Sequence, residues 1–252
     1  MTAVILKIIA MVTMLCDHTY SLFAEPPLGW YIGRLAFPLY ALMLVESYRH
    51  LKDDPKRLKK YVVSLAILAT VSEVGYDLVF SGKIVDVIGQ NQILQFLTFV
   101  LAAILSKKIS KNIFKALLWI GVIALNQFCL MGYYALGIIT MLLLWWYLER
   151  YEGEGLVRRF LDISAVMVIF WIGNVALELV LYPEYLMMEG HVSWPLVFES
   201  LTRFAVTLLL IPVIAFYNGQ YGNPPKWFRV IYRYFYPAHL YILALIAFLL
   251  KR

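Results

Sequence analysis

Ionisable side chains interrupt several long apolar stretches of this sequence. Asp17 and His18 lie near the end of the first stretch, and Arg34 lies near the start of the second. A charge at the centre of a bilayer costs at least ~2.5–3.5 kcal/mol, so such residues usually face the interior of a helix bundle or a wet cavity. A neutral imidazole beside a carboxylate is the arrangement of a general base, which takes a proton from a nucleophile. We therefore predict a catalytic centre at His18, with Asp17 and Arg34.

Helical geometry limits how these groups can interact. Adjacent residues on a helix point about 100° apart, so we do not expect Asp17 to bond directly to His18. Arg34 is the expected partner of Asp17, and another carboxylate, such as Glu73, is expected to hold His18. Lys7, Met11, Met14 and His18 are separated by four, three and four residues, so they form one stripe along the first helix.

More ionisable residues are expected at the same depth, in the outer half of the membrane. Asp77 follows Glu73 by four residues, and Glu199 precedes Arg203 by four, which is the favoured order for an ion pair within a helix. We assign Asp77, Glu178 and Arg203 to substrate binding. A purely structural role in helix packing stays open for such residues, because each buried hydrogen bond in a membrane bundle contributes about 0.6 kcal/mol.

The composition indicates that these side chains belong to a membrane protein. Of 252 residues, 62% are apolar or aromatic and 15% are charged, whereas soluble domains are about 45–50% apolar. This excludes an ordinary soluble enzyme and a disordered region. Cys16 and Cys129 both lie in apolar stretches, so a disulfide framework is not expected. The net charge of +6 comes from basic residues spread over short loops, which does not indicate nucleic-acid binding.

The apolar runs predict an all-α, polytopic transmembrane bundle of about nine spans, which forms a single integral-membrane domain over residues 1–252. A bilayer core needs about 20 apolar residues per helix. The stretch between Lys115 and Glu149 holds no charge and is too long for one span, so we expect a tight hairpin near Met131-Gly132. The expected spans are 4–23, 32–48, 61–80, 91–106, 113–129, 132–148, 163–181, 195–217 and 234–250.

Loop charges predict the orientation of these spans. The linkers after the second, fourth, sixth and eighth spans hold most of the Lys and Arg residues, and cytoplasmic loops collect these residues. We therefore expect a cytoplasmic amino terminus and place the end of the chain, Lys251-Arg252, outside. Pro38 and Pro212 lie inside spans and are expected to kink them or to open a backbone carbonyl toward a cavity.

Several catalytic motifs are missing from the sequence. It has no nucleophile elbow and no phosphate-binding GxxxxGK[ST] loop. It also has no HExxH and no CxxC, so we do not expect a catalytic metal.

An ordered set of short motifs resembles the TraX family over nearly the whole chain. The motifs are Leu6-Lys7-Ile8-Ile9-Ala10, Met14 with Asp17-His18, Ile32-Gly33-Arg34, Phe37-Pro38-Leu39, Glu46, His50, Ser72-Glu73, Asn91, Tyr217-Asn218-Gly219, Gly222 and Tyr236-Pro237 with His239-Leu240. The chain departs from the family at Gly132-Tyr133-Tyr134, where the family tends to have Asp-Tyr-Gly. It also departs at Ser47, where the family often has Gly.

The resemblance implies an acyltransferase of the bacterial inner membrane. The family takes its name from a conjugation protein that N-acetylates the amino terminus of pilin, and it looks similar to transmembrane acyltransferases with an essential His in the first helix. His18 would then be the base, and Arg34 would stabilise charge or contact the cofactor. The donor would be acetyl-CoA, and the acceptor a peptide or a small amine or hydroxyl compound. The expected cofactor-binding residues are Lys226, Arg229, Arg233, Tyr236, His239 and Asn218.

Two other classes of protein fit the same buried charges. One is a proton-coupled small-molecule transporter, although the sequence shows no inverted repeat and nine spans divide poorly into two halves. The other is a non-enzymatic assembly factor for pili or conjugation, which would bind its partner without needing His18.

Overall fold

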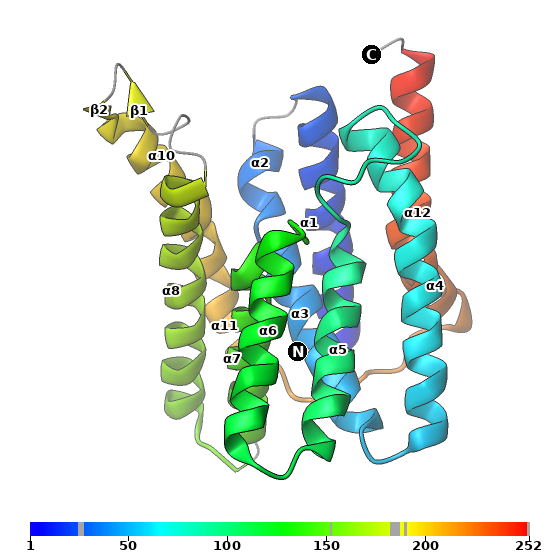
Figure 1. The fold of residues 1–252 in the computed structure, drawn as a ribbon, viewed down its shortest axis with the longest axis vertical. Helices are drawn as coiled ribbons and strands as arrows, with labels where there is room; N and C mark the ends of the chain where they lie inside the picture. Colours follow the sequence, from blue (N-terminus) through cyan, green and yellow to red (C-terminus); the bar gives the residue numbers. More distant parts are fainter. Residues whose placement is uncertain (25–27, 152, 182–186, 189–190, 251–252) are drawn as a thin grey trace. The chain divides into compact units, whose positions relative to one another are not determined.

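The computed structural model describes residues 1–24, 28–151, 153–181, 187–188 and 191–250, and in this part the chain is almost entirely helical (Figure 1). The described strands are a two-residue antiparallel pair, β1 (Met187–Met188) and β2 (His191–Val192). The predicted all-α class is therefore confirmed. The predicted outside location of Lys251-Arg252 lies outside the described residues.

The chain divides into two compact units. Unit 1 comprises Met1–Tyr40 and Trp146–Asn223, and unit 2 comprises Ala41–Trp145 and Pro224–Arg252. Each unit combines an early and a late part of the sequence. The expectation of a single domain over residues 1–252 stays a prediction.

Unit 1 is built on the first helices and the segment before the last one. It holds α1 (Ala3–Phe23), α2 (Leu28–Gly33), α8 (Leu156–Leu181), α10 (Trp194–Ala205), the 3-10 helix η1 (Val206–Leu209) and α11 (Leu210–Ala215). It also holds the first turn of α3 (Ala36–Leu51) and the end of α7 (Tyr134–Tyr151). α1 packs on α2, while α8 packs on α10 and α11.

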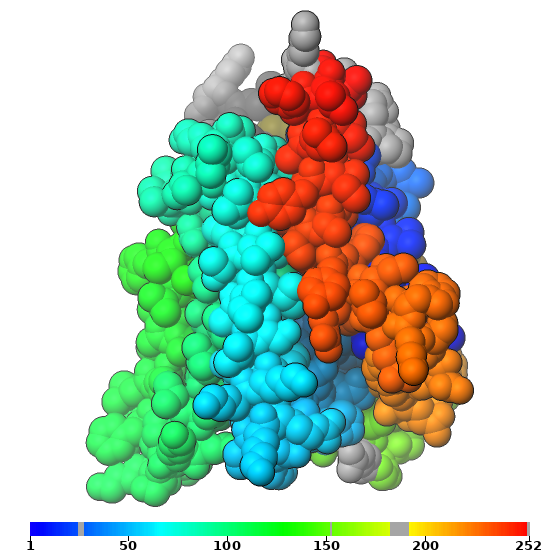
Figure 2. Space-filling view, turned by 90° about the vertical axis from the view of Figure 1, so that its right-hand side faces the viewer, coloured from blue at the N-terminus to red at the C-terminus, as the bar shows by residue number. Residues whose placement is uncertain are grey.

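Unit 2 holds the rest of α3 and α7 together with α4 (Pro55–Phe80), α5 (Gln92–Lys108), α6 (Asn112–Phe128) and α12 (Lys226–Leu249). α12 lies along α4, as the orange-to-red and blue-to-cyan helices of Figure 2 show. Gly75 permits this close contact, because a Cβ there would lie 3.2 Å from the Cβ of Leu240.

Two glycines bring α2 close to α1. A Cβ at Gly29 would lie 2.7 Å from the carbonyl oxygen of Cys16, and a Cβ at Gly33 would overlap the side chain of Asp17. Small residues four positions apart let membrane helices approach closely. Gly29 and Gly33 therefore set the distance between α1, which carries Asp17 and His18, and α2, which Arg34 directly follows.

The predicted proline distortions are present. A turn at Arg34 and Leu35 separates α2 from α3 just before Pro38, and the 3-10 helix η1 directly precedes the segment of Pro212. Proline has no N–H to bond the carbonyl four residues earlier and its ring clashes with that carbonyl. The two helices therefore break where the sequence indicated.

The predicted hairpin near Met131-Gly132 is also confirmed. α6 ends at Phe128 and α7 begins at Tyr134. Gln95 of α5 holds this turn, because its Nε2 donates to the carbonyl oxygens of Met131 (2.9 Å) and Tyr134 (2.8 Å). The buried Gln95 was not identified from the sequence, since the pattern does not show which turn a polar side chain reaches.

Within the described residues, six helical segments are long and apolar enough to cross a membrane. They are Ala3–Phe23, Leu28–Leu51, Pro55–Phe80, Leu156–Leu181, Trp194–Ala215 and Lys226–Leu249. The other three predicted spans coincide with α5 and α6, of 17 residues each, and α7, of 18. A helical membrane bundle is thus supported, while nine crossings and the orientation stay predictions.

Candidate functional site

His18 lies on the buried face of α1. Met11 and Met14 share this face and are also buried, and Lys7 lies at its far end with its Nζ 4.3 Å from the ring centroid of Tyr221. The predicted stripe therefore faces the interior of the protein. The imidazole of His18 is also within electrostatic range of Asp17 and Arg34.

Asp17 and Arg34 form the predicted ion pair. The guanidinium of Arg34 donates to Asp17 Oδ1, and each side chain is only 18% exposed. Arg34 follows directly on Gly33, the residue that lets α2 approach Asp17. A charge-assisted pair between a guanidinium and a carboxylate lowers the cost of holding both groups away from water.

A second ion pair in unit 1 corrects one expectation. Arg203 of α10 donates to Glu178 of α8, whereas Glu199, its expected partner on the same helix, is exposed. Ser200 adds a hydrogen bond of 2.6 Å to Glu178 Oε2. Because Arg203 is buried, it needs a carboxylate on the inward side of the bundle, and the neighbouring helix supplies one.

Aromatic rings connect the two ion pairs. The Cζ of Arg203 lies 4.2 Å from the ring centroid of Trp30 and 4.9 Å from that of Phe204, while the Cζ of Arg34 lies 5.9 Å from Phe204. Cation–π contacts of desolvated arginines contribute about 2 kcal/mol. We call this group the arginine–aromatic cluster; its members are Asp17, Trp30, Arg34, Glu178, Arg203 and Phe204.

The cluster is neutral in sum but keeps hydrogen-bonding capacity. Its two guanidinium groups are balanced by two carboxylates. Arg203 Nε is buried and has no hydrogen-bond partner within the described part of the chain. A buried donor of this kind suits an incoming acceptor atom, such as a carbonyl oxygen that gains negative charge.

Trp30, Ser200 and Phe204 were not identified as site residues from the sequence. A weak signal was available for Trp30, because it precedes Arg34 by four residues, which is the spacing of neighbouring side chains on a helix. Ser200 and Phe204 carry no such signal, since their partners lie on other helices.

Glu73 and Asp77 belong to unit 2, where both hold the turn between α4 and α5. Asn91 donates its backbone N–H (3.2 Å) and its side-chain amide to Glu73 Oε2. Asp77 Oδ2 accepts the backbone N–H of Asp86 at 2.9 Å. Each of these carboxylates therefore has a partner in its own unit, and the expectation that Glu73 holds His18 stays a prediction.

The expected cofactor residues on α12 divide into two groups. Lys226, Arg229 and Arg233 are exposed and follow the helix at spacings of three and four residues, so they share one face. His239 is buried, with Nδ1 at 2.8 Å from the carbonyl oxygen of Phe235 and its ring stacked on that side chain. The structure thus presents three cations together and places His239 in the core.

The remaining two expected cofactor residues have different environments. Tyr236 is partly buried on α12, and its ring lies edge-on to His239 at 5.6 Å. Asn218 belongs to unit 1, is exposed, and accepts the backbone N–H of Gln220 at 3.1 Å. The turn that it forms is anchored by Tyr217, whose carbonyl oxygen accepts from Tyr151 and from the guanidinium of Arg159.

Cys16 and Cys129 are free thiols. Within the ranges that the structure covers, no group of three or more His, Cys, Asp or Glu side chains is placed to hold a metal ion.

Comparison with known proteins identifies a single family. The sequence model of the family described as TraX protein matches residues 3–247. No curated protein and no solved structure matches the chain significantly. The matched region includes α1, α2 and the entire arginine–aromatic cluster. Since the match extends over nearly all of the sequence, the chain belongs to the TraX family.

Proposed function

We propose that this protein is a membrane-embedded acyltransferase that uses acetyl-CoA to acetylate the amino terminus of a pilin-like or other peptide. The observation that carries the proposal is the buried His18 beside the Asp17–Arg34 ion pair on two closely packed helices. An imidazole in such surroundings is suited to proton transfer. The family assignment supports the same reaction class through its association with pilin processing.

The proposed chemistry divides the work between His18 and the arginines. An amine attacks the thioester carbonyl carbon, the C–N bond forms, and the C–S bond breaks to release CoA as the thiol. His18 takes the proton that the attacking amine must lose and returns it to the leaving sulfur. Arg34 and Arg203 supply donors for the negative charge on the carbonyl oxygen in the transition state.

The Asp17–Arg34 ion pair keeps the site from carrying excess positive charge. A lone arginine beside His18 would oppose protonation of the imidazole, because like charges repel. Asp17 compensates this charge and fixes the guanidinium in place. Glu178 does the same for Arg203.

The donor is proposed to approach α12. The cations of Lys226, Arg229 and Arg233 share one exposed face, and CoA carries several phosphate groups. This proposal includes nine membrane crossings with a cytoplasmic amino terminus, since α12 then begins on the side where acetyl-CoA is found. Neutralising these three side chains should raise the KM for acetyl-CoA without lowering kcat.

Transfer of radiolabelled acetyl groups tests the proposal directly. The purified protein is reconstituted in liposomes with [14C]acetyl-CoA and a synthetic peptide that has an apolar segment and a free amino terminus. The same peptide with a blocked amino terminus serves as the substrate control. We expect label on the free peptide alone.

Two variants locate the catalytic base. His18→Asn should abolish transfer, while Leu15→Ala, which changes the exposed face of the same helix, should leave it unchanged. Size-exclusion profiles check that both variants fold. Wild-type transfer by His18→Asn would refute the role of His18, and solute flux in the absence of any transfer would favour a transporter.

A further inference from the structure

The connection between α4 and α5, residues 81–91, is unusually apolar for an exposed turn. We call it the α4–α5 loop. Four aliphatic side chains in it are exposed: Ile84 (69%), Val85 (71%), Val87 (84%) and Ile88 (71%). Contiguous apolar surface of this kind marks contact with another protein or with a membrane.

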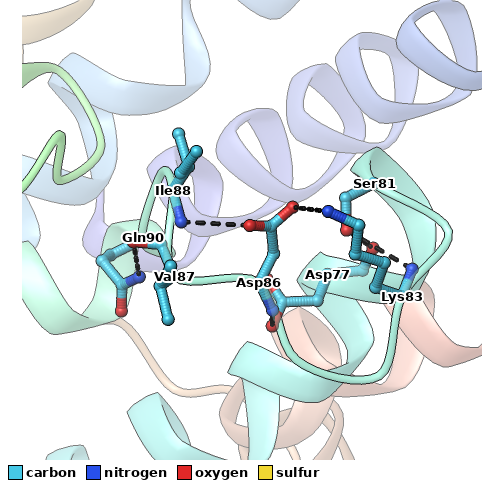
Figure 3. Close-up of polar contacts among 7 residues, drawn as sticks. All are labelled: Asp77, Ser81, Lys83, Asp86, Val87, Ile88 and Gln90. Carbon is cyan, nitrogen blue, oxygen red and sulfur yellow. Dashed lines mark hydrogen bonds and ion pairs between the residues drawn. The ribbon is translucent and has the colours of Figure 1, made fainter.

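The polar groups of the loop are largely occupied by one another (Figure 3). Asp86 lies at the centre: its Oδ1 accepts the backbone N–H of Ile88 at 3.1 Å, and its Oδ2 pairs with Lys83 Nζ at 3.4 Å. Its own N–H donates to Asp77 Oδ2. The one Lys and the one Asp of the loop therefore cancel in charge.

The far end of the loop is tied to the neighbouring turn. Gln90 donates its backbone N–H to the carbonyl oxygen of Leu130 at 3.2 Å and accepts the N–H of Gly132 at 3.1 Å. At its start, Ser81 Oγ donates to the carbonyl oxygen of Asp77 at 2.9 Å, so the loop is held by hydrogen bonds at its start, centre and end. Its aliphatic side chains are left outside this network.

The loop directly follows a helix that has exposed apolar side chains of its own. Val63, Ile67 and Val71 follow one another at spacings of four residues and are exposed, although α4 is long and apolar enough to cross a membrane. Phe80, the last residue of α4, is exposed as well. In a membrane helix such exposed apolar side chains face lipid, and the loop adds four more directly after the helix ends.

We propose that the α4–α5 loop inserts its four aliphatic side chains into the interfacial layer of the bilayer and anchors this end of α4 to the lipid. The network bonds the backbone N–H groups of Asp86, Ile88 and Gln90 within the protein, and the water and headgroups of the interfacial layer can bond the rest of the loop backbone. The flexible stem of Lys83 lets its ammonium group reach the headgroups.

This inference does not depend on the proposed acetyl transfer. Fluorescence quenching in liposomes tests it. In a background with Cys16→Ala and Cys129→Ala, single cysteines replace Ile84, Val85, Val87 or Ile88 and are labelled with the fluorophore NBD. Two quenchers of the NBD fluorescence are compared. A spin label near the headgroup end of the lipid acyl chain reports insertion into the bilayer, and iodide reports exposure to water.

Two positions on α4 serve as matched controls. Ile67→Cys lies on the exposed apolar stripe and should report lipid, and Lys56→Cys lies exposed at the start of the helix and should report water. We expect the loop positions to be quenched by the spin-labelled lipid several-fold more than Lys56→Cys, and to be protected from iodide. Iodide quenching equal to that of Lys56→Cys would overturn the proposal, and so would protection from both quenchers, which indicates a protein partner.

A second measurement retains the native cysteines. The photo-reactive amino acid benzoylphenylalanine at position 87 should form adducts with lipid on irradiation. Adducts with another protein chain in place of lipid would contradict the inference.

Discussion

Removal of one partner from the Asp17–Arg34 ion pair is expected to destabilise the protein by about 2–3 kcal/mol. The estimate lies between about 0.2–1 kcal/mol for pairs exposed to water and about 3–5 kcal/mol for the loss of one partner from a buried pair. With 18% of each side chain exposed, this pair is closer to the buried case. Asp17→Asn and Arg34→Gln remove the charges with little change in shape.

A double-mutant cycle measures the interaction by itself. The two single variants and the double variant are unfolded reversibly with SDS in mixed micelles, and the free energies of unfolding are compared. The double variant should be little worse than either single variant, because the second substitution removes no further ion pair.

The exposed ion pair between Asp53 and Lys107 provides the matched control. Its atoms lie 2.8 Å apart, but the side chains are 79% and 44% exposed. The same cycle with Asp53→Asn and Lys107→Met should give a much smaller coupling, since water screens both charges. Equal coupling in the two cycles would refute the argument that burial strengthens the Asp17–Arg34 pair.

Three further predictions follow from other contacts. Gly33→Ala should lower both thermal stability and acetyl transfer, because the added Cβ would overlap the side chain of Asp17 on α1. Gly121→Ala should be tolerated, because no atom lies near the added Cβ there. Melting curves and the transfer assay compare the two variants. Asn91→Ala should lower the free energy of unfolding by about 2 kcal/mol, because it removes the cap of α5 and leaves buried groups unpaired. Asn91→Ser should recover about half of this loss, because serine can also cap a helix. Equal free energies of unfolding in SDS for the two variants would count against the cap. The hydrogen bond from Lys107 holds the pKa of Asp53 below its ordinary value. The stability that this carboxylate contributes is therefore complete above the unfolded pKa and is lost as the pH falls through the folded pKa. Carboxyl NMR titration should show a higher pKa of Asp53 in Lys107→Met than in the wild type, and an unchanged pKa would exclude the lysine as the cause.

Much of the helical architecture was predictable from the sequence. Every predicted span lies mainly on helical segments, although the spans 32–48 and 195–217 are broken near Pro38 and Pro212. The turn at Met131-Gly132 was also located. These features depend on local causes, namely apolar run length, the missing N–H of proline and the absence of charge. Apolar run length does not decide the number of membrane crossings, because α5, α6 and α7 are at the short end of the lengths that span a bilayer.

The candidate site was predictable only in part. The pairing of Asp17 with Arg34 followed from two costly charges that must each find a partner near the same end of adjacent helices. The expected partner of Arg203 was wrong: the sequence order favoured Glu199 on the same helix, whereas the structure pairs Arg203 with Glu178. Which of two carboxylates an arginine reaches depends on the face that its helix buries.

The sequence by itself thus determined that the protein is a helical membrane protein of the TraX type, with an imidazole and compensating charges in its first two helices. Hydrophobic length and the cost of buried charge act on each segment separately, so they can be deduced without coordinates. Only the tertiary structure showed that Trp30 and Phe204 join the two arginines into one cluster, and that Glu73 and Asp77 hold the α4–α5 turn. These contacts join segments far apart in the chain, and their geometry is set by how the helices pack.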